Sequence, residues 1–159
     1  MNNIFTKFEK VVYPEKYHII KSMKHVYEQK VFYADTDAYG IAWHGSYTRW
    51  LEAGRCLWCE EMGYPLTVLD EMDIVLPVVN LNIRYKSSAK FNDDIVIETW
   101  LDKFSTVSAT FKQIIKSKET GKTFVEATVD IVAVNKQGKL YRKMPDVLNS
   151  VFEKALKEE

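Results

Sequence analysis

Two aspartates and one histidine lie within ten residues in the segment Asp35-Thr36-Asp37-Ala38-Tyr39-Gly40-Ile41-Ala42-Trp43-His44. Carboxylate and imidazole groups supply the bases and nucleophiles of many hydrolytic sites. Aspartate also favours turns and helix caps, so an isolated Asp-x-Asp pair is more often structural than catalytic. Here the whole segment lies between a strand-like stretch and an aromatic-striped helix, which favours a functional role.

The elements on either side would hold this segment in place. Residues 25–33 alternate in polarity, which predicts a strand, and residues 35–40 are rich in turn formers. After them, apolar residues recur at spacings of three and four, which predicts an amphipathic helix that ends at Gly63 and Pro65. Its apolar stripe consists of Tyr47, Trp50, Leu51, Gly54, Leu57, Trp58 and Met62.

Gly54 stands inside that apolar stripe. Glycine within a helix costs about 1 kcal/mol relative to alanine. We therefore expect another backbone to approach the helix closely here, as a sheet wrapped around it would.

The rest of the chain is mainly strand-like. Residues 66–72 form a short helix or an ordered loop, and a C-terminal helix is predicted from Pro145 to Leu156. Short connections between strands indicate antiparallel neighbours, and one striped helix with one such sheet indicates an α+β fold. The four later strands are expected at residues 74–86, 94–103, 107–115 and 124–134.

Length and composition set limits on function. A chain of 159 residues points to one domain, and its 22 basic and 22 acidic residues cancel, so no bulk charge favours nucleic acid or an anionic membrane. No apolar run is long enough to span a membrane, and the N-terminus lacks the pattern of a signal peptide. Two cysteines do not make a disulfide framework, so we expect a reduced, cytoplasmic location.

Residues 32–47 resemble the signature of the 4-hydroxybenzoyl-CoA thioesterase family, and most closely its acyl-CoA thioesterase branch associated with the Tol–Pal cluster. The shared pattern is an aromatic pair, Asp-Thr-Asp, a glycine-containing turn and an aromatic-His before a helix. Residues 84–93 are similar to a second landmark of the family. The resemblance covers roughly residues 25–155 and implies a hotdog fold, a long central helix wrapped by an antiparallel sheet of about five strands. We expect residues 1–24 to be an N-terminal extension, with short helices before Pro14 and near residues 17–23, and residues 25–159 to be the thioesterase domain.

The resemblance also implies an activity, hydrolysis of an acyl-CoA to the free acid and CoA. The family's essential carboxylate corresponds to Asp37, which would attack the thioester or activate a water. Backbone N–H groups around His44 to Ser46, at the helix start, would polarise the carbonyl. The His44 side chain would hydrogen-bond to Asp37 or to the departing thiolate. A thiolate leaves without a strong general acid, because its pKa is low.

Other residues of this region are assigned less specific roles. We expect Asp35 to be a turn or cap residue. The family commonly has asparagine where Ser46 stands and a proline near Ser88, and this chain has neither. Cys56-x-x-Cys59 lies well inside the predicted helix and has no second cysteine pair, so we expect packing and predict no metal and no cofactor.

Glu52 is a second carboxylate on the predicted helix. Arg49 precedes it by three residues and Arg55 follows it by three, so surface ion pairing is the expected role. Because a helical glutamate is catalytic in another branch of hotdog enzymes, Glu52 is the alternative catalytic residue.

Binding residues are predicted from charge and aromaticity. The phosphates of CoA require cations, and the candidates are Arg84, Lys86 and Lys90, with a second cluster at Lys139, Arg142 and Lys143. Either cluster could instead be a solvated face. The acyl pocket could be lined by Tyr39, Trp43 and Tyr47, or these rings could pack in the core.

The resemblance leaves two alternative functions open and implies an oligomeric state. The leaving group could be acyl carrier protein instead of CoA, or the protein could bind acyl thioesters without hydrolysing them. Because hotdog active sites lie at subunit boundaries, a homodimer or homotetramer is expected.

Overall fold

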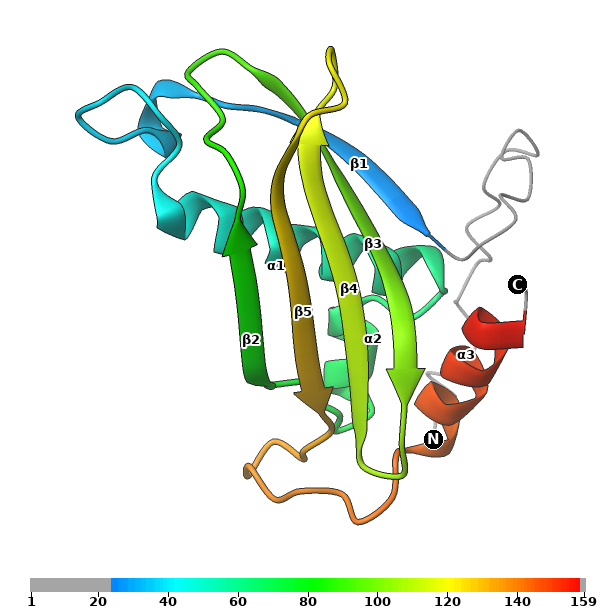
Figure 1. The fold of residues 1–159 in the computed structure, drawn as a ribbon. Coiled ribbons are helices and arrows are strands. Elements are labelled where there is room, and N and C mark those ends of the chain that lie inside the picture. The colour runs from blue at the N-terminus through cyan, green and yellow to red at the C-terminus, as the bar shows by residue number, and fades with distance from the viewer. Residues whose placement is uncertain (1–23, 158–159) are drawn as a thin grey trace, which may run out of the picture.

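Five antiparallel strands form one sheet in the order β1-β3-β4-β5-β2. The computed structural model describes residues 24–157, and Figure 1 shows the sheet with a long helix crossing one face. The strands are β1 (His25–Lys30), β2 (Val78–Tyr85), β3 (Asp94–Phe104), β4 (Ser108–Ser117) and β5 (Thr123–Val132). The predicted α+β class and the hotdog arrangement are confirmed.

The long helix α1 (His44–Glu61) packs against the sheet mainly through β3, β1 and β4. At Gly54, a Cβ atom would lie 2.5 Å from Thr99 Oγ1 and 3.0 Å from Gln113 Nε2. The expected close approach at this glycine is therefore confirmed, although the approaching groups are strand side chains and not backbone.

A buried amide joins the helix to the sheet beneath that glycine. Gln113 Nε2 donates to the carbonyl of Leu51 and to Thr99 Oγ1, both at 2.8 Å. Its Oε1 accepts from Arg55 at 2.9 Å. Because the buried Gln113 side chain is hydrogen-bonded at both ends, it anchors α1 over the sheet without the cost of an unpaired polar group.

The C-terminal helix α3 (Asp146–Lys157) closes one end of the core. Its buried side chains are Leu148, Val151, Phe152 and Ala155, and Phe152 lies beside Trp58 and Phe111. This cluster packs on the C-terminal half of α1, and the first turns of α1 lie at the other end of the helix, next to the loop that follows β1 (Figure 1).

Some boundaries differ from the sequence-based predictions. The first strand ends at Lys30, and residues Tyr33–Asp35 form a 3-10 helix, η1. The strand expected from residue 74 begins at Val78, with only an isolated bridge from Val75 to Val134 before it. Helix α2 (Leu66–Glu71) is confirmed as a short helix. The helices predicted before residue 24 lie outside the described residues. Within residues 24–157, no helix combines the length and the apolar character needed to cross a membrane.

Candidate active site

Asp37 lies in a tight loop between η1 and α1. Its N–H donates to the carbonyl of Ile41 at 2.9 Å, and its carbonyl accepts the N–H of Gly40 at 3.0 Å. Gly40 has a φ of 73°, a left-handed conformation that favours glycine. The carboxylate Oδ1 accepts the N–H of Tyr39 at 2.8 Å, so the loop itself orients the side chain.

The Asp37 side chain is half-buried and faces an open cavity of about 420 Å³. Its Oδ2 accepts no hydrogen bond from the residues that the structure describes, so this oxygen is available to a ligand. The cavity is lined by Asp37, Ile41, Ala42, His44, Tyr47, Tyr85, Lys86, Ser87 and Ser88.

The start of α1 meets the same cavity. The first N–H groups of a helix have no intrahelical acceptor and carry the positive end of the helix dipole. Ser46 N–H bonds to the carbonyl of Trp43 at 2.8 Å, whereas the N–H groups of His44 and Gly45 have no acceptor among residues 24–157. Of the backbone donors predicted around His44 to Ser46, these two are therefore the ones that a ligand could use.

Gly45 has a steric reason to be glycine. A Cβ atom there would lie 2.1 Å from Cζ3 of Trp43, so the indole folds directly over this residue. The Trp43 ring also lies against the His44 ring, with centroids 4.9 Å apart. Any larger residue at position 45 would therefore displace the Trp43 ring.

His44 contributes more through its backbone than through a contact with Asp37. Its carbonyl accepts the hydroxyl of Tyr85 at 3.1 Å. Among the described residues, no hydrogen bond joins the His44 ring to the Asp37 carboxylate, although both line the cavity. The His44 side chain is exposed and lines the cavity.

A second segment holds the Asp37 loop against the fold. Ala42 N–H bonds to the carbonyl of Ala89 at 2.8 Å, and Ile41 bridges to Lys90. The buried hydroxyl of Tyr47 accepts the N–H of Ala89 at 2.9 Å. Burial raises the pKa of Tyr47, so its phenol stays neutral and serves the structure as an acceptor.

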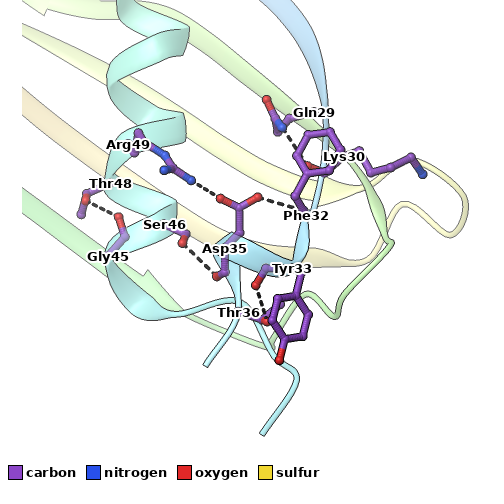
Figure 2. A network of polar contacts seen from close by, with 10 residues as sticks. All are labelled: Gln29, Lys30, Phe32, Tyr33, Asp35, Thr36, Gly45, Ser46, Thr48 and Arg49. Atoms are coloured by element: carbon purple, nitrogen blue, oxygen red, sulfur yellow. Dashed lines mark hydrogen bonds and ion pairs between the residues drawn. The ribbon is translucent and has the colours of Figure 1, made fainter. Parts of the chain in front are cut away.

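Asp35 ties the loop to α1, as Figure 2 shows. Its carboxylate is buried, accepts the N–H of Phe32 at 2.9 Å and forms an ion pair with Arg49. Its carbonyl accepts the N–H of Trp43 at 2.8 Å and the hydroxyl of Ser46 at 2.9 Å. These contacts agree with the predicted turn-and-cap role and give Ser46 a definite hydrogen-bonding function.

Only some of the predicted binding residues meet at the cavity. Tyr47 and Lys86 line it, and Lys86 Nζ also pairs with Glu126 at 2.5 Å. Arg84 instead lines a separate hollow of about 270 Å³ beside Trp100.

Besides Arg84, three other predicted binding residues lie outside the cavity lining. The side chain of Tyr39 is 89% exposed, and only its N–H contacts Asp37. Trp43 covers the helix start, and Lys90 contributes its backbone. These three positions therefore shape the loop more than they line the cavity.

Within residues 24–157, Glu52 forms neither of the ion pairs predicted for it with Arg49 and Arg55. Arg49 pairs with Asp35, and Arg55 bonds to Gln113, because the folded loop and strand present better-placed acceptors than the next helical turn does. Glu52 is exposed and lines a different, smaller cavity of about 220 Å³ with Arg55 and Cys56.

The two thiols behave as packing residues. Burial raises the pKa of Cys59 to about 12 and raises the pKa of Cys56 as well, so neither is a ready thiolate. No group of three or more potential metal ligands is present among residues 24–157.

Tyr85, Ser87 and Ser88 also line the cavity but were not identified as site residues from the sequence. They belong to the second family landmark, residues 84–93, in which only the cationic side chains were predicted to bind substrate. The signal that was missed is the order of the elements along the chain. The end of β2, which follows α1 in the sequence, lies beside the start of α1 because the sheet brings the two together. Burial raises the pKa of Tyr85, so it acts as a neutral hydrogen-bond donor.

Comparison with known proteins identifies the family of this chain. Residues 31–152 match the family model of the thioesterase-like superfamily. The chain belongs to this superfamily. Among its relatives, YneP of Bacillus subtilis is 28% identical over 134 residues, covering 82% of this chain and 96% of that protein. The acyl-CoA thioester hydrolase YbgC of Escherichia coli O157:H7 is 26% identical over 123 residues, covering 77% of this chain and 91% of that one.

A solved thioesterase structure has the same fold. The DHNA-CoA thioesterase from Staphylococcus aureus superposes with a TM-score of 0.77 at 24% identity, covering 84% of this chain and 91% of that one. At this identity the similarity shows that the two proteins share a fold.

Proposed function

We propose that this thioesterase-like protein hydrolyses acyl-CoA thioesters to a carboxylic acid and CoA, with Asp37 as nucleophile or general base. The observation that carries the proposal is the shared cavity, into which both the Asp37 carboxylate and the start of α1 open. Relatives that are named acyl-CoA thioester hydrolases support the substrate class.

The geometry accounts for each part of the reaction. The thioester carbonyl oxygen would accept the free N–H groups of His44 and Gly45, and a well-placed donor of this kind stabilises the transition state by about 3–4 kcal/mol. Asp37 would attack the carbonyl carbon to give a mixed anhydride, which water then hydrolyses, or would take a proton from an attacking water. In both routes the C–S bond breaks and the electron pair leaves with the CoA sulfur.

The neutral phenol of Tyr85, at the end of β2, supports this arrangement. Its bond to the His44 carbonyl holds the first turn of α1 in place, and Ser87 and Ser88 line the same cavity. Lys86 lies at the same cavity and forms an exposed ion pair with Glu126. We propose that Lys86 leaves Glu126 and binds a phosphate of CoA when the substrate enters. Arg84 and Lys90 would act farther along the nucleotide, outside the cavity.

The proposal extends to the chain as a whole. We propose that residues 1–24 are an extension and that residues 25–159 form the catalytic domain, since the family match begins at residue 31. Free Cys56 and Cys59 support a reducing, cytoplasmic location.

A substrate panel tests the proposed activity. Short-chain, long-chain and aromatic acyl-CoA should release CoA at enzyme concentrations that leave the matched acyl carrier protein substrates largely intact. Faster turnover of an acyl carrier protein substrate would reassign the leaving group. Binding of CoA with no hydrolysis of any acyl-CoA would show a binding protein instead of an enzyme.

We also propose that two copies pair through the edge strand β2. This strand bonds to β5 on one side only and exposes apolar side chains, including Val79 at 59% and Leu81 at 42%. An exposed apolar edge strand pairs readily with another strand, and a two-fold axis would pair β2 with itself. The cavity beside Tyr85, at the end of β2, would then lie next to the partner subunit.

Light scattering tests this assembly. The wild-type protein should have at least twice the mass of one chain, and Leu81→Lys should lower that mass and the rate of hydrolysis together. Lys112→Ala, a change of an exposed residue in the central strand β4, should alter neither. A wild-type monomer at working concentration would contradict the pairing.

A further inference from the structure

The buried carboxylate of Asp35 connects the loop that carries Asp37 to the body of α1. Its side chain is 5% exposed, yet it carries a negative charge that must be balanced. The balancing group is Arg49, which lies in the second turn of α1 (Figure 2). The ion pair thus bridges two elements that must keep a fixed distance if Asp37 and the helix N–H groups are to act on one substrate.

We propose that the ion pair between Asp35 and Arg49 positions Asp37 against the first turn of α1, so that both are positioning residues for hydrolysis. This inference rests on the proposed function, because it assumes that Asp37 is the reactive carboxylate.

The backbone between Asp35 and Asp37 couples the position of one aspartate directly to that of the other. Only Thr36 separates them, and its backbone is extended, with φ −102° and ψ 157°. The Thr36 hydroxyl donates to the Tyr33 carbonyl at 2.8 Å, and Thr36 bridges to Ala42. A shift of Asp35 would therefore be carried to Asp37, with no flexible residue between them to absorb it.

The backbone of Asp35 holds the helix start at the same time. Its carbonyl accepts from Trp43 and Ser46, the residues that flank the free N–H groups. Asp35 is therefore joined to the Asp37 loop through the backbone, contacts the helix start through its carbonyl and contacts the body of α1 through its ion pair with Arg49. Because a misplacement of about 1 Å can slow an enzyme about 100-fold, a loss of this connection should reduce catalysis strongly.

The surroundings of Arg49 make the inference testable by chemical rescue. The Arg49 side chain is 61% exposed and borders an open cavity of about 450 Å³, which Phe32, Ala34 and Trp50 also line. In an Arg49→Ala variant, a free guanidinium ion could enter from this cavity and restore the charge beside Asp35. This cavity is distinct from the one that Asp37 lines.

The first experiment measures Arg49→Ala with and without guanidinium. We expect kcat to fall by about 10- to 100-fold, while KM changes far less, because Arg49 does not line the substrate cavity. Guanidinium at millimolar concentration, far below the molar range that unfolds proteins, should recover a large part of kcat, whereas sodium at equal ionic strength should not. Lys136→Ala, which removes a surface ion pair with Asp70, should keep the wild-type rate and ignore guanidinium.

Two further variants separate positioning from simple loss of structure. Arg49→Lys keeps the cation but loses the planar fork, so its kcat should lie between those of the wild type and Arg49→Ala. In an Asp37→Asn background, Arg49→Ala should cause no further loss, because the two changes act on one step.

The outcomes distinguish the two proposals. A folded Arg49→Ala variant with wild-type kcat would overturn the positioning role, as would an inactive variant that neither guanidinium nor lysine restores. If Asp37→Asn itself kept wild-type activity, the proposed role of Asp37 would fail, whatever Arg49→Ala showed; if the wild-type protein hydrolysed no acyl-CoA, the proposed function would fail.

Discussion

Replacing Gly54 with alanine should destabilise the protein, although alanine is the better helix former. A Cβ atom at this position would lie 2.5 Å from Thr99 Oγ1, and Thr99 and Gln113 are almost completely buried. Overpacking of a core costs about 1–3 kcal/mol, and displacing Thr99 from Gln113 costs about 1 kcal/mol more. Since the gain in helix propensity is about 1 kcal/mol, the net loss should be about 1–3 kcal/mol.

Urea unfolding followed by tryptophan fluorescence measures this loss. All variants must be compared at one protein concentration, because association would contribute to stability. Thr99→Ala removes the clashing hydroxyl, so Gly54→Ala should cost at least about 1 kcal/mol less in that background than in the wild type. A Gly54→Ala protein as stable as the wild type would refute the close packing of α1 on the sheet.

Three other predictions concern single side chains. Tyr47→Phe removes the acceptor of the Ala89 N–H, so the urea midpoint should fall, consistent with a loss of about 1–3 kcal/mol; an unchanged midpoint would contradict the bond. Burial alone would raise the pKa of Glu98, but ion pairs with Lys116 and Lys24 outweigh burial and hold this pKa below its ordinary value. A carboxyl whose pKa is depressed by folding stabilises the fold at pH values above its unfolded-state pKa of about 4.3, and this stabilisation is lost as pH falls through its folded-state pKa. Glu98→Gln should therefore flatten the acid limb of a stability–pH curve. An equally steep limb would count against these ion pairs. Because burial raises the pKa of Cys59 to about 12, a thiol reagent at neutral pH should label it only after urea is added; rapid labelling of the native protein would show that the helix opens.

Much of the fold was predictable because its signals are local. Alternation in residues 94–103 and the apolar stripe of α1 both reflect one buried face, and each is read within a few residues. Gly54 was informative for the same reason, since a glycine in a helix stripe has few explanations other than close contact. The segment around Asp37 stood out because its residue types and order are unusual for a plain turn.

The remaining features depend on contacts between distant parts of the chain. Arg49 was expected to pair with Glu52, its neighbour on the helix, but the fold brings Asp35 to it across the loop. Tyr85 reaches the helix start only because β2 pairs with β5, which places the end of β2 beside His44. Spacing along the chain carries no information on either contact, because both depend on sheet order and loop geometry.

The rate of CoA release by Asp37→Asn tests the central claim most directly. The variant keeps the size of the side chain and one oxygen that can accept the Tyr39 N–H, but it loses the charge that attacks the thioester or activates water. We expect turnover to fall by about 100- to 10,000-fold, with the urea midpoint and CoA binding unchanged. Asp70→Asn, at an exposed position in α2, should keep the wild-type rate. If Asp37→Asn hydrolysed acyl-CoA as fast as the wild-type protein, Asp37 would not be the reactive carboxylate.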